Sequence, residues 1–129
     1  MIERFIYQGG WGTMKHQESE FIRIERPEQG VVVLFPVGDI DMSRSPELRT
    51  VIRQEMGSGV HKMIVDLDDV EYMDSSGLAT LVEAMRNASK TDTKLVLCHM
   101  HQKVSAIFEI ARLDSFFSIV GTREEAVSL

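Results

Sequence analysis

The stretch MIVDLDDVEYMDSSGLATLVEAM, residues 63–85, passes from a strand-like pattern to a helix-like pattern across one loop. It opens with a compact apolar run of strand length, which is typical of a strand covered on both faces of a sheet. After the loop, apolar residues recur at the spacing of an amphipathic helix, at Leu78, Leu81, Val82 and Met85. A strand that leads directly into a helix is the repeating unit of sheets with parallel strands, so this stretch predicts an α/β fold.

Upstream of this stretch, the pattern predicts a hairpin. Residues 21–25 (FIRIE) alternate apolar and charged side chains, which favours a strand with one face in water. Pro27 and Gly30 then predict a turn before a second strand over residues 31–38.

A helix is predicted next, after Ser43 and before the stop signals Gly57 and Gly59, with Pro46 accepted in its first turn. Its apolar stripe consists of Leu48, Val51, Ile52 and Met56.

Downstream, strands are predicted over residues 94–98 and 116–120. A third helical stripe lies between them, and a last helix begins at Thr122, which stands in capping-box spacing with Glu125. The stripe consists of Val104, Ile107, Phe108 and Ala111. The predicted order is therefore β-β-α-β-α-β-α-β-α. It describes a mixed, mostly parallel sheet of about five strands with about four helices, whose crossovers are right-handed.

Length and composition predict one domain. The 129 residues are 43% hydrophobic and 26% charged, which is enough to bury a core without disulfides or metals. Residues 1–20 show no periodicity and are expected to form a flexible extension, within which Met14 is an alternative start, whereas residues 21–129 form the domain. The lone Cys98 excludes an internal disulfide and favours a reducing compartment.

The charge balance argues against nucleic acid and membrane partners. Twenty acidic and fourteen basic residues leave a net charge of −6, and the sequence shows no basic patch to offset it. No apolar run is long enough to cross a bilayer, and the N-terminus lacks the order of a signal peptide. A cytoplasmic protein is expected.

Three interpretations of the loop Asp74–Gly77 remain open. Asp74 or Ser75 can serve as the N-cap of the following helix. A serine can act as a catalytic nucleophile, but Met73 stands where the G-x-S-x-G elbow needs its first glycine, and no motif ties a histidine to the loop. A hydroxyl at the helix start can also be a phosphorylation site, since the positive end of the helix dipole tolerates a phosphate there.

Two further clusters contain residue types that can bind metal ions, but neither is expected to do so. Cys98, His99 and His101 offer zinc ligands, but strand alternation separates the first two and no second ligand pair follows, so no metal site is expected. The acidic run at Asp66, Asp68, Asp69 and Glu71 is interpreted as a solvated loop. The stripes of the second and third predicted helices are interpreted as core.

Three segments together resemble the STAS domain of bacterial anti-sigma factor antagonists, a domain also found in sulfate transporters. They are VGDIDMSRSPELR, the 63–84 stretch and KLVLCHMHQKVSAIFEIARLDSFFSIVGTREEAV. The similarity extends over about residues 21–129. The D-S-S/T-G motif of the family matches Asp74, Ser75, Ser76 and Gly77, and its G-x-I/L-D element matches Gly38, Ile40 and Asp41.

The resemblance implies a partner switch. The unphosphorylated antagonist binds an anti-sigma factor that is also an ATP-dependent serine kinase, and a sigma factor is thereby released. Phosphorylation of Ser75, the hydroxyl that follows the motif's acid, abolishes the complex, and a metal-dependent serine phosphatase restores it. Asp41 is expected near the partner surface, with Gly38, Asp74, Ser76 and Gly77 supporting the site. No catalytic residue and no cofactor is implied. Alternatives are a STAS scaffold or transporter-associated STAS protein that does not switch and, more remotely, a serine hydrolase.

Overall fold

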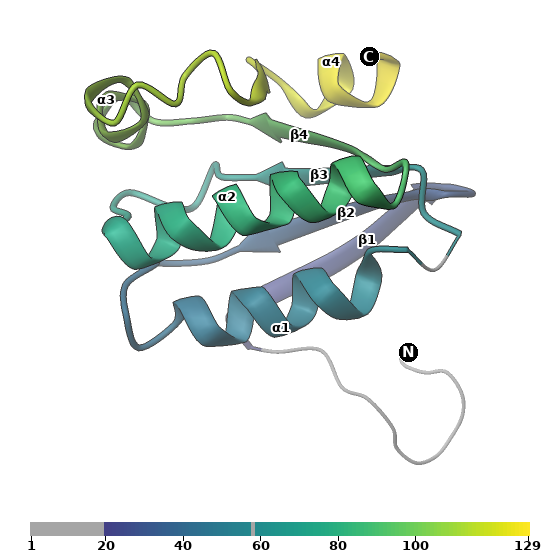
Figure 1. Cartoon of the computed structure of the whole chain (residues 1–129), viewed down its shortest axis with the longest axis horizontal. Coiled ribbons are helices and arrows are strands. Elements are labelled where there is room, and N and C mark those ends of the chain that lie inside the picture. The colour runs from purple at the N-terminus through teal and green to yellow at the C-terminus, as the bar shows by residue number, and fades with distance from the viewer. Residues whose placement is uncertain (1–19, 58) are drawn as a thin grey trace.

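The computed structural model describes residues 20–57 and 59–129 (Figure 1). The predicted extension, Met14 included, lies outside the described residues except for Glu20. Within them, the predicted order of five strands and four helices is confirmed. The elements are β1 (Ile22–Glu28), β2 (Val31–Pro36), α1 (Ser45–Glu55), β3 (Lys62–Asp66), α2 (Ser75–Lys90), β4 (Lys94–Cys98), α3 (Gln102–Ile110), β5 (Ser118–Val120) and α4 (Arg123–Ser128).

The five strands form one sheet in the order β1-β2-β3-β4-β5. β1 is antiparallel to β2, and the other neighbours pair in parallel. Parallel neighbours need a crossover connection, and here a helix supplies it each time. The functional loops therefore gather where parallel strands end and helices begin.

The three central strands β2, β3 and β4 are buried on both faces, which explains their continuous apolar sequences. Alternate residues of β3 divide between two core clusters, with Met63 and Val65 in the larger and Ile64 in the smaller. α1, α2 and α3 contribute side chains to the larger cluster, and Ala126 of α4 completes the smaller one. Figure 1 shows α1 and α2 side by side across one face of the sheet.

Three expected boundaries are wrong. β1 continues through Pro27, which was expected in the turn, to Glu28, with an irregular register between Glu25 and Glu28. Proline is tolerated there because β1 is an edge strand. β2 ends at Pro36 and not at residue 38. The start of α1 is as predicted, since the helix begins at Ser45, after Ser43, and has Pro46 in its first turn. Its N-cap Arg44 makes no side-chain cap bond, and the Ser43 hydroxyl donates to Asp41.

β5 is shorter than expected. It begins at Ser118, and of the two phenylalanines before it, Phe117 is buried in the core while Phe116 is exposed. The predicted capping box of α4 is confirmed, with Thr122 and Glu125 bonded reciprocally.

No helix among residues 20–57 and 59–129 is both long and apolar enough to cross a membrane.

Candidate functional site

Two loops at the carboxyl edge of the sheet are joined by backbone hydrogen bonds. Ile40 and Met73 form a parallel bridge, in which the Ile40 N–H donates to Tyr72 O (3.0 Å) and the Asp74 N–H donates to Ile40 O (3.1 Å). Earlier in the same two loops, the Gly38 N–H donates to Asp69 O at 2.9 Å. The structure thus brings together the two elements that the sequence identified, Gly38–Asp41 and Asp74–Gly77.

Asp74 is the N-cap of α2. Its Oδ1 accepts from the backbone N–H of Ser76 (2.8 Å) and of Gly77 (3.2 Å), and also from the Ser76 hydroxyl (2.6 Å). These bonds to the carboxylate, that of the Ser76 hydroxyl above all, hold the pKa of Asp74 below its usual value of 3.8. The capping interpretation is confirmed, and Asp74 carries a full negative charge at neutral pH.

The two serines of the loop differ in what their hydroxyls do. Ser76 Oγ is committed to Asp74. Ser75 is the first residue of α2 and is exposed, and its hydroxyl makes no hydrogen bond to any other residue that the structure describes. The Ser75 N–H likewise has no acceptor in the described part of the chain. Of the two, Ser75 offers the accessible and uncommitted oxygen.

Gly77 allows α2 to begin this close to the bridged loops. A Cβ at this position would lie 2.7 Å from Met73 Cγ and 2.8 Å from Ile40 Cγ2, closer than real contacts allow. Gly38 serves the other loop, because its φ of +99° lies in the region that favours glycine. At both positions, steric constraints therefore explain why the residue is glycine.

Asp41 adds a second carboxylate beside the cap. Its Oδ1 accepts from the hydroxyl of Ser43 (2.6 Å) and from the Ser43 N–H (3.0 Å). The hydroxyl bond above all lowers the pKa of Asp41, although the nearby charge of Asp74 opposes the shift. The site thus presents two ionised carboxylates within electrostatic reach of each other.

Two large exposed side chains lie within two residues of these acids in the sequence. Met42 is 76% exposed and Tyr72 is 49% exposed, and each neighbours a residue of the bridged loops. Exposed aromatic and methionine side chains are enriched in protein interfaces. Neither residue could be predicted from the sequence, because they belong to no periodic stripe and only the folded loops reveal their exposure.

A groove of about 620 Å³ begins at Ser75 and follows the outward face of α2. Leu113, from the connection between α3 and β5, forms its other wall. Leu78, Ala79 and Val82 line it near Ser75, and Glu83, Arg86, Asn87 and Lys90 line it further along. Leu78 belongs to the core, as predicted, but only in part. It is half-buried against the core, and its remaining surface lines the groove.

The acidic run is only partly the solvated loop that the sequence predicted. Asp68, Asp69 and Glu71 are exposed, but Asp66 is 1% exposed at the end of β3. Arg123 Nε donates to its Oδ2 at 3.2 Å, and His99 Nδ1 lies 2.9 Å from its Oδ1. The interpretation of Asp66 as solvated is wrong, because its partners come from α4 and from the residue after β4, which no local pattern connects to it.

Asp66, Cys98 and His99 have ligand atoms within 4.8 Å of one another, a donor set suited to zinc. Both oxygens of Asp66 are already engaged, however, and burial raises the pKa of the Cys98 thiol to about 12. A cation would have to compete with the Arg123 guanidinium and deprotonate a thiol that resists it. His101 bonds elsewhere, with Nε2 at the Asp68 carbonyl. The Asp66 carboxylate is therefore held by Arg123 and His99, and Cys98 is a core side chain.

Comparisons with known proteins agree with this architecture. The family model of the STAS domain matches residues 23–126, so the chain belongs to the STAS domain family. It is similar to the anti-sigma-B factor antagonist of Staphylococcus aureus, with 28% identity over 82 residues that span 64% of this chain and 76% of that protein.

Two solved structures show the same fold. An anti-sigma factor antagonist from Mycobacterium paratuberculosis matches with a TM-score of 0.75 at 23% identity, over 83% of this chain and 90% of its own. The phosphorylated form of SpoIIAA, a Bacillus cell fate determinant, matches with a TM-score of 0.66 at 21% identity, over 83% of this chain and 96% of its own. The predicted fold and family are confirmed.

Proposed function

We propose that this protein is an anti-sigma factor antagonist that is switched by phosphorylation of Ser75. The unmodified form binds an anti-sigma factor with ATP-dependent serine kinase activity, and the bound anti-sigma factor releases its sigma factor. The kinase then modifies Ser75, the complex separates, and a serine phosphatase restores the first state. The proposal places the chain in the cytoplasm, where sigma factors act, as a substrate and ligand and not as an enzyme.

One observation carries the proposal: Ser75 presents an exposed and uncommitted hydroxyl at the N-terminus of α2, while its neighbour Ser76 is bonded to the capping carboxylate. A kinase needs an accessible acceptor oxygen. A hydrolase would need a base within hydrogen-bond reach of that oxygen, and none contacts it among the described residues. The same exposure therefore favours modification over catalysis.

The free domain can accept the phosphate. The group would lie in water at the positive end of the α2 dipole, beside the Ser75 N–H, which has no other acceptor in the described part of the chain. Two of the first N–H groups of the helix are already used by Asp74, so the added stabilisation is limited. Solvent screening keeps the repulsion with Asp74 and Asp41 small.

The complex cannot accept it as easily. A phosphoserine adds about −1.5 to −2 charges at pH 7. In an interface that excludes water, this charge would lie beside the ionised Asp74 and Asp41, where like charges repel far more strongly. Since each 1.4 kcal/mol lost weakens binding about tenfold, a modest repulsion separates the partners without any refolding.

The test uses a candidate anti-sigma factor of the ATPase-type serine kinase class. The protein is incubated with this kinase and Mg-ATP, and mass spectrometry locates the added phosphate. We expect it on Ser75. Ser75→Ala should bind the kinase constitutively, and Ser75→Asp should bind at least about tenfold more weakly.

Ser76→Ala is the matched control, because it removes a hydroxyl one residue away that is bonded to Asp74. It should still be phosphorylated on Ser75 and should bind. Phosphate found reproducibly on another residue, or equal binding by the alanine and aspartate variants of Ser75, would show that the assignment is wrong. Full binding with no phosphorylation would instead favour a STAS scaffold that does not switch.

A further inference from the structure

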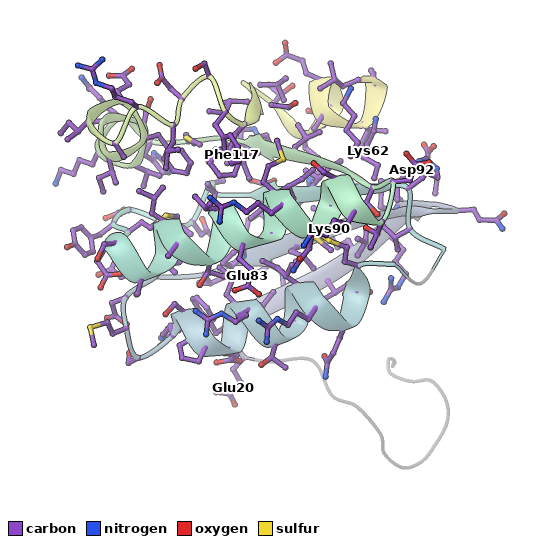
Figure 2. The ribbon with its side chains drawn as sticks, in the orientation of Figure 1. Glu20, Lys62, Glu83, Lys90, Asp92 and Phe117 are labelled. Carbon is purple, nitrogen blue, oxygen red and sulfur yellow. The ribbon has the colours of Figure 1, made fainter. Side chains whose placement is uncertain are left out.

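Along the groove that begins at Ser75, the outward face of α2 changes from apolar to positively charged side chains. Ser75, Leu78, Val82, Arg86 and Lys90 follow one another at intervals of three or four residues, so they form one stripe along the helix. Figure 2 shows Lys90 near the end of α2, and Glu83 on the side of α2 that faces α1.

The first half of the groove is apolar. Leu78, Val82 and Leu113 are half-buried against the core, and their remaining surface lines the groove next to Ser75. Leu113 comes from a different part of the chain, so the apolar surface has two walls and is more than one helix face. A bound segment could bury apolar side chains between them.

The second half of the groove is cationic. Arg86 and Lys90 make no ion pair or hydrogen bond through their side chains with any residue in the described ranges, whereas Glu83 is bound by Arg49 and Arg53 of α1. The acid Glu83 is thus neutralised by α1, and two cations with no partner in the described part of the chain remain on a protein whose net charge is −6. The sequence showed no such basic patch, because it depends on which charges pair in the fold.

These cations are too far from Ser75 to serve its phosphate. Arg86 follows Ser75 by 11 residues along a continuous helix, which corresponds to about 16 Å at 1.5 Å per residue. That distance exceeds the Debye length of about 8 Å at physiological ionic strength. Arg86 and Lys90 are therefore available to an external partner in both phosphorylation states.

The two ends of the stripe have opposite charge, since Asp74 and Asp41 lie at the Ser75 end. We propose that this groove binds an amphipathic, acidic segment of the anti-sigma factor, whose apolar side chains face Leu78, Val82 and Leu113 and whose carboxylates face Arg86 and Lys90. The opposite charges of the two ends set the direction of the segment. This inference rests on the proposed function and gives the switch a second contact, distant from the modified serine.

The experiment reverses the two cations. Arg86→Glu/Lys90→Glu changes exposed side chains only, so the fold should persist, and thermal denaturation checks this. We expect its affinity for the anti-sigma factor to fall at least tenfold at low salt, with a smaller loss at high salt. Lys94→Glu/Lys103→Glu makes the same change of charge at exposed positions outside the groove, and should bind within about twofold of the unchanged protein.

The outcomes separate this inference from the function on which it rests. If the unchanged protein binds and the groove variant binds equally well, the groove assignment is wrong while the antagonist function stands. Equal weakening by both double variants would show a general effect of charge and would also overturn the assignment. If the unchanged protein does not bind the anti-sigma factor, the proposed function fails and the groove assignment fails with it.

Hydrogen exchange of the complex provides a second measurement that needs no substitution. Amides near Leu113, in the other wall of the groove, should become protected when the anti-sigma factor binds. Protection confined to the two bridged loops would contradict the groove assignment and leave the Ser75 site intact.

Discussion

At the scale of single residues, the loop assigns different tasks to neighbouring side chains that the sequence presents as a uniform polar motif. Asp74 caps the helix, Ser76 reinforces the cap and Gly77 permits close approach. Ser75 is left with a hydroxyl that bonds to no other residue among those described. The motif therefore separates the structural work of the loop from the proposed chemistry. Each of these roles can be tested by one substitution.

Gly77→Ala should destabilise the domain by about 1–3 kcal/mol, the usual cost of overpacking. The added methyl group would meet Met73 and Ile40 at less than 3 Å, and Ile40 is held by backbone hydrogen bonds on both sides. Urea denaturation measures the effect. Gly121→Ala is the control, since its new Cβ meets one side-chain atom only, Glu125 Oε1 at 3.1 Å, and it should cost clearly less than Gly77→Ala. Equal effects would contradict the close-approach argument.

The cap also predicts how stability depends on pH. The folded-state pKa of Asp74 lies below the unfolded value, so its carboxylate stabilises the fold above about pH 4 and loses this effect as pH falls through the folded pKa. Asp74→Asn should reduce the slope of the urea midpoint against pH between about pH 5 and 2. Asp41 shifts in the same direction, so some slope should remain. An unchanged slope would show that Asp74 contributes nothing to acid unfolding.

At the scale of elements, α4 is the shortest helix of the described fold and is held at both ends. Its N-terminus has the Thr122–Glu125 capping box. Near its C-terminus, the buried Lys62 of β3 donates to the carbonyls of Ala126 (3.0 Å) and Val127 (2.7 Å), which satisfies acceptors that a helix end leaves free. This contact fastens the helix over the smaller core cluster.

Lys62→Met should loosen α4 before the rest of the domain. Hydrogen bonds that involve a charged group contribute about 1.5–3 kcal/mol, and the substitution removes two of them while keeping the apolar stem. Amide exchange in α4 should accelerate more than exchange in α2. Lys94→Met is the control, because Lys94 is the direct partner of Lys62 in the sheet register but is exposed. Equal protection of α4 in both variants would contradict the anchoring role.

At the scale of the whole molecule, periodicity was enough to predict the fold, since both-face burial makes β3 and β4 continuous apolar runs and one-face burial makes the helices amphipathic. What it could not supply were contacts between distant residues. Arg123 meets Asp66 across 57 positions, and Arg53 meets Glu83 across 30. The contact with Arg123 compensates the burial of the Asp66 carboxylate, and the contact of Arg53 with Glu83 leaves the groove with a positive charge.

The reactivity of Cys98 reports on the integrity of the whole fold. The thiol is fully buried in the smaller core cluster beneath α4, and burial raises its pKa to about 12. At pH 8 the buried thiol is therefore protonated, and the thiolate is the reactive form. A thiol-specific reagent should therefore label the native protein only as fast as it opens, and the unfolded protein at once.

Comparing the labelling rate of Cys98 with the rate of amide exchange shows whether global unfolding or local opening of α4 exposes the thiol. If labelling follows global unfolding, its rate should rise with urea as steeply as unfolding itself. In Lys62→Met the loosened α4 should expose Cys98 by a local route, so labelling should accelerate at zero urea while α2 stays protected. Rapid labelling of the unchanged protein, independent of urea, would mean that α4 already opens in the native state and that its two anchors do not hold it.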